Sequence, residues 1–300
     1  MSTLETIESG YFYDPIDLVL NAGQPWVLYH DHGREDQVLG ARAGAESWSL
    51  HPMTNGGHDG WYNSGTIGPD GMLLTATYDP AGFSSVGVNY GVWTGSEWTI
   101  EVAAEGSFDY AGGMALVRTT DGSVHIAFFD DVLGEVKLAT RTGVNWTVTT
   151  VEPVGDALDV GRFPDIVVDP DGSTLHMLYL RQATSSTGVV RYARGGPGAF
   201  EIMDVIEVSG FSIGPSGARD LATLDLDGSG RPVIATQTTS AFTVIPLVGR
   251  VAESIASFPA ADGVSFAQQP EIKIGALGRT HMVWWQSGDI PGTVCHAVSG

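Results

Sequence analysis

Short apolar segments, separated by turn residues, recur along the whole chain. A first segment leads into a tight turn and then into a second, more strongly apolar segment, as in residues 165–168, Gly172 and residues 176–180. An Asp-Gly turn between apolar segments predicts a β-hairpin, because glycine accepts the positive φ that a tight turn needs. Successive turns lie 48, 51, 50, 56 and 50 residues apart and centre on Gly23, Gly71, Gly122, Gly172, Gly228 and Gly278.

Each of these units continues with two more segments. The third segment has the pattern Val-x-x-small, as in Val136 and Ala139. The fourth segment opens on an aromatic residue in four units, at Trp48, Trp98, Trp146 and Phe200. No apolar period of 3.6 residues continues for three turns, so we expect few helices. Four antiparallel strands in about fifty residues, repeated six times, predict an all-β fold, a six-bladed β-propeller.

The two ends of the chain complement each other in this scheme. The sixth unit stops after its third strand, and residues 4–7 have the form of a fourth strand. We therefore expect the N-terminal strand to complete the last blade and so to remove an open edge. The prediction is a single domain over residues 1–300. Its blades cover approximately 11–50, 60–101, 109–151, 162–205, 218–256 and 268–300, the last together with 1–9.

One face of such a propeller carries the longer connections, which join strands two and three and link one blade to the next. Long loops on a rigid scaffold are common binding sites. Aromatic and charged side chains gather in these loops and suit a sugar or another flat, polar ligand. The candidate ligand-binding residues are Trp61, Tyr62, Asp109, Tyr110, Arg162, Arg219 and Asp220. The alternative is that the rings only pack the loops on one another.

Carboxylates lead several of the first strands, which line the central channel. Converging carboxylates repel one another unless they are hydrated, protonated or neutralised by a cation such as Ca²⁺. The weak metal candidates are Asp17, Asp165 and Glu271. The alternative is a polar channel filled with water, and no Asp-x-Asp-x-Asp calcium loop occurs in the sequence. We expect no required cofactor and leave open a divalent cation at the channel.

Three histidines, His125, His176 and His281, open second strands at equivalent places. Equivalent positions in different blades lie far apart, so these residues are poor partners for one metal ion. We expect buried imidazoles that hydrogen-bond within their own blade. Four other histidines are better metal candidates, because they fall near the long loops of the first two blades: His30, His32, His51 and His58.

Charge and cysteine content exclude several classes of partner. The 300 residues include 14 Lys and Arg against 35 Asp and Glu, which gives a net charge of −21. This surplus disfavours nucleic acid and anionic membrane surfaces as partners. The single cysteine, Cys295, rules out an internal disulfide framework and lies in an apolar strand as an expected inert core thiol. No apolar run reaches the roughly 18 residues that span a bilayer.

The compartment stays open from the sequence. The N-terminus lacks the charged and apolar regions of a secretory signal. We expect an extracellular or periplasmic protein if a signal has been removed, and a cytoplasmic protein otherwise.

Units three and four resemble a widespread bacterial propeller repeat. The match lies in residues 121–131 and 163–179, with the pattern Pro-x-Ile-x-x-Asp-x-x-Gly-x-x-His-Ile-x-Tyr, followed by Tyr-Ala and Trp. This resemblance implies a closed propeller, often exported, and its motif residues are structural. Residues 94–98 and 142–146 are weakly similar to the Asp-box repeats of sialidase-like propellers, without their Ser-x-Asp. Six-bladed fucose-binding lectins are similar in the period and in the units that end on Trp, but the sequence of their binding pockets is not shared.

Catalytic signatures are missing: the sequence has no Gly-x-Ser-x-Gly, His-Glu-x-x-His, phosphate loop or dinucleotide fingerprint. We therefore favour a monomeric, lectin-like binding protein that recognises a glycan or another polar ligand on the long-loop face, and lean away from an enzyme. The alternatives are a glycan-active hydrolase or lyase with one carboxylate and histidine site at the channel mouth, and a protein-interaction scaffold. Similar pockets between blades would favour a lectin, and one asymmetric pocket at the channel would favour an enzyme.

Overall fold

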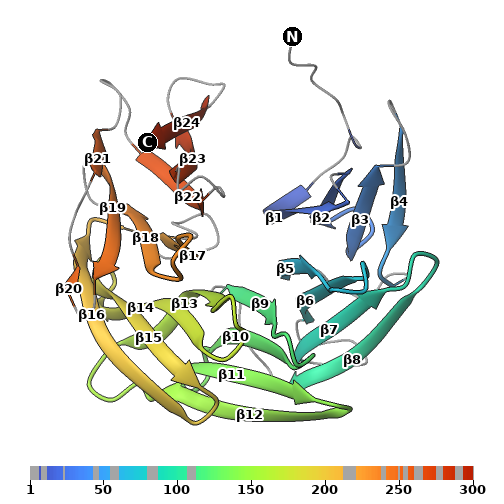
Figure 1. Ribbon diagram of the computed structural model, residues 1–300, viewed down its shortest axis with the longest axis horizontal. Helices are drawn as coiled ribbons and strands as arrows, with labels where there is room; N and C mark the ends of the chain where they lie inside the picture. The colour runs from blue at the N-terminus through green and yellow to red at the C-terminus, as the bar shows by residue number, and fades with distance from the viewer. Residues whose placement is uncertain are drawn as a thin grey trace.

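The computed structural model is built from antiparallel strands, with no helix in the part of the chain that it describes (Figure 1). The described residues are 7, 12–22, 24–42, 47–54, 61–79, 87–106, 113–211, 221–237, 241–248, 251–252, 256–259, 266–274, 280–287 and 293–299. These described residues contain no helix that is long and apolar enough to cross a membrane.

The chain forms one sheet after another, and the first three sheets have four strands each. The first contains β1 (Phe12–Asn21), β2 (Gln24–Asp31), β3 (Asp36–Arg42) and β4 (Trp48–Pro52). The second contains β5 (Trp61–Ile67), β6 (Leu73–Asp79), β7 (Gly87–Trp93) and β8 (Trp98–Glu105). The third contains β9 (Met114–Arg118), β10 (Val124–Asp130), β11 (Glu135–Thr142) and β12 (Asn145–Glu152).

The later sheets follow the same order of strands. The fourth contains β13 (Asp159–Val168), β14 (Leu175–Thr184), β15 (Thr187–Gly196) and β16 (Ala199–Ser209). The fifth contains β17 (Ala222–Leu226), β18 (Pro232–Gln237) and β19 (Ala241–Val248), and β19 pairs with both β20 (Val251–Ala252) and β21 (Ala256–Pro259). The described sixth sheet contains β22 (Phe266–Ile274), β23 (Thr280–Ser287) and β24 (Thr293–Ser299).

Six antiparallel sheets surround a central axis, each with its first strand innermost (Figure 1). This arrangement confirms the predicted all-β, six-bladed propeller. The Asp-Gly turns join first and second strands as expected, and Gly71, Gly122 and Gly172 all have positive φ. In the turn of the fifth sheet the positive φ lies at Gly230 and not at the predicted Gly228. The predicted domain limits stay a prediction.

The hydrophobic core is divided among the seams between successive sheets. Each apolar cluster takes its residues from two neighbours, because a sheet that is covered on both faces must bury side chains on both. Val19 and Leu28 of the first sheet, for example, pack with Leu73 and Trp93 of the second. Comparable clusters join the second sheet to the third, the third to the fourth and the fourth to the fifth.

The expected closure of the last blade falls mostly outside the described residues. Ile7, the one described residue of the segment 4–7, lies against the first sheet: a Cβ added to Gly40 would be 2.9 Å from its Cγ2 atom. In the described part of the sixth sheet, β24 pairs only with β23. Closure by residues 4–7 therefore stays a prediction.

Candidate functional site

A cluster of polar and aromatic side chains occupies the seam between the outer strands of the second and third sheets. Tyr90 of β7 pairs with Glu101 of β8, and Arg141 of β11 pairs with Trp146 of β12. Directly paired residues of an antiparallel sheet point to the same face. Each pair therefore projects into the seam, where the two pairs meet. We call these four residues the Glu101 cluster.

Hydrogen bonds to its neighbours fix the carboxylate of Glu101. Arg141 donates from Nε to Oε2 at 2.8 Å and from Nη2 to Oε1 at 2.7 Å, which is the parallel two-bond geometry favoured by guanidinium and carboxylate. The indole Nε1 of Trp146 donates to Oε2 at 3.1 Å. The third sheet thus supplies every one of these donors to a carboxylate of the second sheet.

Aromatic rings complete the cluster. The guanidinium carbon of Arg141 lies 5.6 Å from the centre of the Tyr90 ring, within the range of a cation–π contact. The rings of Tyr90 and Trp146 meet edge to face with centres 5.4 Å apart. Tyr90 is buried, whereas the side chains of Glu101 and Arg141 are 41% and 23% exposed. Solvent, and therefore a ligand, can reach the charged pair.

The electrostatics keep both members of this pair charged at neutral pH. The hydrogen bonds of Arg141, and then that of Trp146, hold the pKa of Glu101 below its usual value. Glu101 in turn raises the pKa of Arg141. A formal anion, a formal cation and an indole therefore lie side by side at one accessible place.

The neighbouring seams use the same register with different chemistry. Between the first and second sheets, His51 takes the place of Glu101, and Trp93 and Trp98 take those of Arg141 and Trp146. There the indole of Trp98 donates to the backbone oxygen of His51 at 3.2 Å, and the rings of His51 and Trp93 lie 4.4 Å apart.

The seam between the third and fourth sheets differs again. The corresponding register positions hold Thr149, Gly195 and Phe200. The structure describes this position in three seams. Of these three, the seam between the second and third sheets alone holds a charged pair there, Glu101 and Arg141.

Two of the predicted ligand-binding residues have described side chains. Arg162 donates from Nε and Nη2 to Asp159 Oδ2 at 2.9 and 2.8 Å, and its guanidinium carbon lies 4.6 Å from the centre of the Phe129 ring. Tyr62 is half-buried with a φ of 54°. Trp61 opens β5, but its side chain is outside the described part of the structure, as are Asp109, Tyr110, Arg219 and Asp220. The predicted set on the long-loop face stays a prediction.

Two of the three metal candidates join neighbouring inner strands. Asp17 Oδ2 accepts the N–H of Gly65 in the next sheet at 2.6 Å. Asp165 accepts its neighbour's N–H, from Ile166, at 2.8 Å and the N–H of Leu224 in the next sheet at 2.7 Å. We call these contacts aspartate bridges.

A third aspartate bridge was not foreseen from the sequence. Asp225 accepts the N–H of Leu226 at 2.8 Å and that of Ile274 in the sixth sheet at 2.7 Å. Glu271 of β22 pairs with Val283 of β23, and the side chain of Glu271 is not among those described. Within the described residues, no three His, Cys, Asp or Glu side chains gather as a metal site would require.

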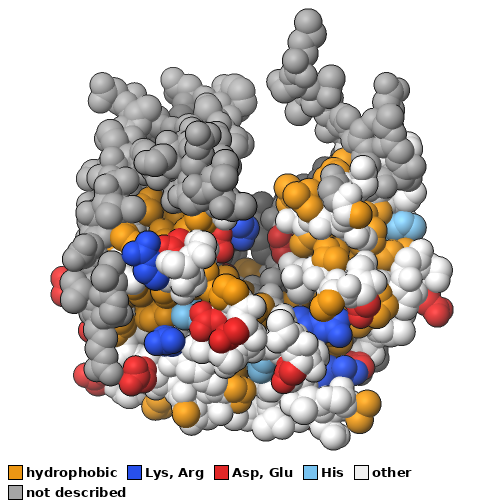
Figure 2. All heavy atoms as spheres, in the orientation of Figure 1, with side chains coloured by type: hydrophobic (Ala, Val, Ile, Leu, Met, Phe, Trp, Pro, Cys, Tyr) orange, Lys and Arg blue, Asp and Glu red, His pale blue; other side chains and the backbone are white. Residues whose placement is uncertain are grey.

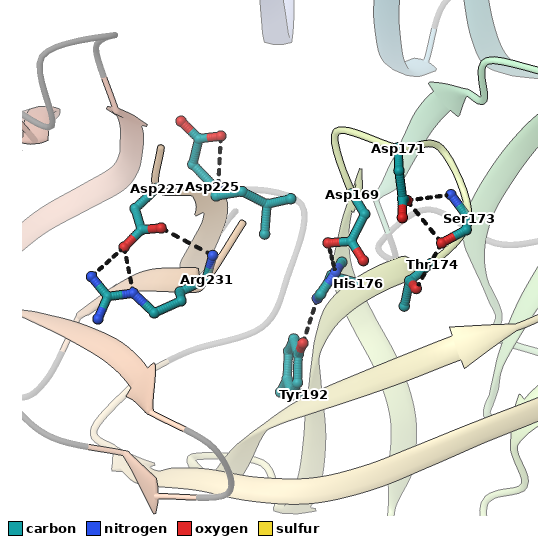
Figure 3. A network of polar contacts seen from close by, with 10 residues as sticks. Asp169, Asp171, Ser173, Thr174, His176, Tyr192, Asp225, Asp227 and Arg231 are labelled. Atoms are coloured by element: carbon teal, nitrogen blue, oxygen red, sulfur yellow. Dashed lines mark hydrogen bonds and ion pairs between the residues drawn. The ribbon is translucent and has the colours of Figure 1, made fainter. Parts of the chain in front are cut away.

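Two of the three histidines that open second strands, His125 and His176, are buried and hydrogen-bonded within their own sheets, as expected. His125 Nδ1 lies 3.1 Å from the Thr140 hydroxyl. His176 contacts Asp169 Oδ1 through Nε2 at 2.8 Å and the Tyr192 hydroxyl through Nδ1 (Figure 3). Burial lowers the pKa of both imidazoles.

The remaining histidines form no metal site in the described structure. The rings of His30 and His32 lie 6.3 Å apart, and His51 lies in the first seam. His58 and the side chain of His281 fall outside the described residues.

The acidic turns next to His176 bind their own loops. Asp171 accepts hydrogen bonds from the backbone and hydroxyl of Ser173, at 2.9 and 2.8 Å (Figure 3). Asp227 accepts from Ser229 and from Arg231 Nε, the latter at 2.7 Å. Although burial opposes it, these hydrogen bonds hold the pKa of Asp227 well below its usual range. The carboxylates of Asp171 and Asp227 are therefore ionised and already hydrogen-bonded within their own turns.

Comparison with known proteins identifies the fold. No family model and no curated protein matches the chain. A protein of unknown function from Dyadobacter fermentans is similar over 94% of this chain and 93% of that chain, at 11% identity and a TM-score of 0.63. AofleA from Arthrobotrys oligospora matches over 95% and 82%, at 10% identity and a TM-score of 0.60.

A lectin supplies the third comparison. The Aleuria aurantia lectin, in complex with Fucα1-6GlcNAc, matches over 95% of this chain and 94% of that chain, at 12% identity and a TM-score of 0.54. At such low identity the similarity shows the fold alone. The chain is a six-bladed β-propeller, with the same architecture as propeller lectins.

Proposed function

We propose that the protein binds a neutral glycan in the seam between its second and third sheets, at the Glu101 cluster. The observation that carries this proposal is the accessible carboxylate and guanidinium pair beside Trp146, with Arg141 bonded to Glu101 at 2.7 and 2.8 Å. This pair is also the charged exception among the three seams compared above.

The chemistry of the cluster suits a sugar. A hydroxyl can donate to the ionised Glu101, and a neighbouring hydroxyl or ring oxygen can accept from Arg141, since charge-assisted hydrogen bonds are the strongest of their kind. The apolar C–H face of a sugar ring can pack on an exposed part of Trp146, as aromatic side chains combine apolar faces with a polar edge.

Charge favours a neutral ligand. The protein carries a net charge of −21, and Glu101 is ionised at neutral pH. Both features repel sialylated, sulfated or uronic-acid glycans over distances of several ångströms.

The structural comparison supports the same ligand class. The Aleuria aurantia protein, which shares this architecture, is a lectin in complex with a fucosylated sugar. We therefore place fucosylated glycans first among the neutral glycans to be tested.

A glycan array with the fluorescently labelled protein tests the proposal. We expect binding to neutral glycans, followed by at least a tenfold loss of affinity in Glu101→Gln, because a hydrogen bond to a charged group contributes about 1.5–3 kcal/mol. His51→Gln is the matched control, since His51 holds the equivalent position in the first seam, and its affinity should be unchanged.

Two results would argue against this site. One is an array without any bound glycan. The other is glycan binding that survives Glu101→Gln and Arg141→Met but is lost in Tyr62→Ala, which would move the site to the long-loop face. Thermal unfolding of each variant shows whether it retains the fold.

A further inference from the structure

The ribbon of β11 and β12 carries three pairs of side chains on the face that meets the second sheet. Paired residues point to the same face, and so do residues two apart in one strand. Ala139 identifies this face, since it packs in the apolar cluster that joins the second and third sheets. The three pairs are Arg141–Trp146, Ala139–Val148 and Lys137–Thr150.

The third pair belongs to a second group of charged and polar side chains. Lys137 Nζ lies 3.3 Å from Asp130 Oδ2 and 3.5 Å from Glu135 Oε2. The Thr150 hydroxyl donates to Glu135 Oε2 at 3.2 Å. Thr150 is exposed, and the side chains of Lys137 and Glu135 are 15% and 17% exposed. We call Glu135, Lys137 and Thr150 the Lys137 cluster.

Val148 separates the Lys137 cluster from the Glu101 cluster. It is 42% exposed, so apolar surface lies between two groups of polar side chains. Binding sites commonly combine apolar surface with a few placed polar groups. Trp146, Val148 and Thr150 follow one another on one face of β12. At about 3.3 Å per residue, the distance from Trp146 to Thr150 is about 13 Å, which is longer than one sugar ring.

The position of β12 makes this face accessible from outside the ring. In the described structure β12 pairs only with β11, at the outer edge of the third sheet (Figure 1). Acidic and basic side chains lie next to each other on the surface of the second and third sheets (Figure 2). An elongated ligand can therefore lie along β12 and contact both clusters.

The two neighbouring ribbons lack this succession of charged, apolar and charged pairs. The pairs of β7 and β8 are Trp93–Trp98, Gly91–Ile100 and Asn89–Val102. The pairs of β15 and β16 are Gly195–Phe200, Ala193–Ile202 and Arg191–Asp204. Arg191 donates from Nε to Asp204 at 2.7 Å and from Nη1 to Glu152. Of the three ribbons compared, that of the third sheet alone has a charged residue at both ends.

We propose that the glycan bound at the Glu101 cluster is an oligosaccharide, and that it runs along β12 over Val148 to a second subsite at the Lys137 cluster. This inference rests on the proposed function. At the second subsite, one hydroxyl accepts from Lys137 and another donates to Glu135, both as hydrogen bonds to charged groups. The C–H face of an intervening sugar packs on Val148.

Titration calorimetry with ligands of two lengths tests the second subsite in the full chain. The probes are methyl α-fucoside and a neutral tetrasaccharide that ends in fucose. If the array favours another neutral sugar, its methyl glycoside and a tetrasaccharide that ends in it take their place. The tetrasaccharide should bind about tenfold more tightly, because its additional hydrogen bonds are to charged groups.

Two variants locate this gain. Thr150→Val removes the exposed hydroxyl and keeps a β-branched side chain that suits a strand, and Lys137→Met removes the charge. Each should lower the affinity for the tetrasaccharide on the order of severalfold and act little on the methyl glycoside, which does not extend to the second subsite. Asp204→Asn is the matched control, because Asp204 pairs with Arg191 as Thr150 pairs with Lys137. Its affinities should equal those of the wild type.

The results separate this inference from the proposed function. If neither ligand binds, or if both bind Glu101→Gln as well as the wild type, the site at the Glu101 cluster is wrong and the second subsite is wrong with it. If both ligands bind with equal affinity and depend on Glu101, the second subsite alone is wrong. The same follows if the gain with length survives both Thr150→Val and Lys137→Met.

Discussion

Carboxylates serve two different purposes in this molecule, and their partners distinguish the two. Asp165 accepts backbone N–H groups from its own sheet and the next one. Glu101 accepts only side-chain donors in the contacts described above, and it remains 41% exposed. In the first arrangement, the carboxylate oxygens accept hydrogen bonds from the backbone and so stabilise the fold. The second leaves an ionised group that a ligand can reach.

The proposed glycan site should show a characteristic pH dependence. Arg141 holds the pKa of Glu101 below its usual value of 4.5, so the carboxylate stays ionised well into the acidic range. We expect the same glycan affinity from pH 8 to pH 5 and a loss only as the pH falls through the lowered pKa of Glu101. Titration calorimetry at pH 7, 5 and 3 measures this. A decline between pH 7 and 5 would point to a histidine in place of Glu101.

The aspartate bridges should contribute to stability. Asp165→Ala removes the acceptor of the Leu224 N–H and of the Thr223 hydroxyl, and Leu224 is buried. An unsatisfied buried donor costs about 1–3 kcal/mol, and hydrogen bonds to a charged group are worth about 1.5–3 kcal/mol each. We expect the free energy of unfolding to fall by about 3 kcal/mol in a urea titration.

Asp171→Ala is the control for this loss, because the carboxylate of Asp171 bonds only within its exposed turn in the described contacts, and the backbone oxygen that accepts from Thr120 is kept in the variant. The loss of stability in Asp171→Ala should be much smaller than that in Asp165→Ala, because substitutions at exposed positions usually have small effects. If both variants lose the same free energy of unfolding, the aspartate bridge between sheets contributes no more stability than hydrogen bonds within one turn.

At the scale of the elements, close contacts between strands set which glycines can be replaced. Gly161 of β13 has a φ of 114°, and a Cβ there would lie 2.4 to 2.8 Å from atoms of Val136. We expect Gly161→Ala to lower the free energy of unfolding by about 3 kcal/mol or more, from steric overlap together with backbone strain.

Gly143 provides the comparison. Its φ is 64°, but no heavy atom lies within 4 Å of an added Cβ. Gly143→Ala should therefore cost only about 1 kcal/mol. If both variants lose the same stability in urea, backbone conformation alone explains the effect and the contact with Val136 does not.

The strands were largely predictable because each carries its own signal. The Asp-Gly turns, the apolar second strands and the aromatic residues that open fourth strands are local patterns, and Trp48 and Trp98 do begin β4 and β8. Burial of His125 and His176 also followed from their equivalent places in the repeat.

The Glu101 cluster could not be predicted in the same way. Its contacts join residues that are 40 and 45 positions apart and belong to different sheets. The available signal was that Glu101 lies three residues after Trp98, in a unit whose successor has Arg141 and Trp146. This pattern predicts the cluster only if one knows which strands face each other across a seam. That depends on how the sheets pack, which the local sequence does not specify.

At the scale of the whole molecule, one seam geometry is repeated with changing chemistry. The first seam holds an imidazole and two indoles, the second a charged pair with an indole, and the third Thr149, Gly195 and Phe200. The architecture therefore supplies equivalent places, while individual side chains decide which of them can bind. This divergence predicts fewer binding sites than blades.

The most direct test of the account is the stoichiometry of glycan binding, measured by titration calorimetry with the best neutral glycan from the array. Among the described seams only the second carries the charged pair, so we predict one site per chain for the wild type and no measurable binding for Glu101→Ala. Full binding by Glu101→Ala, with the stoichiometry unchanged, would contradict the assignment of the site to this seam.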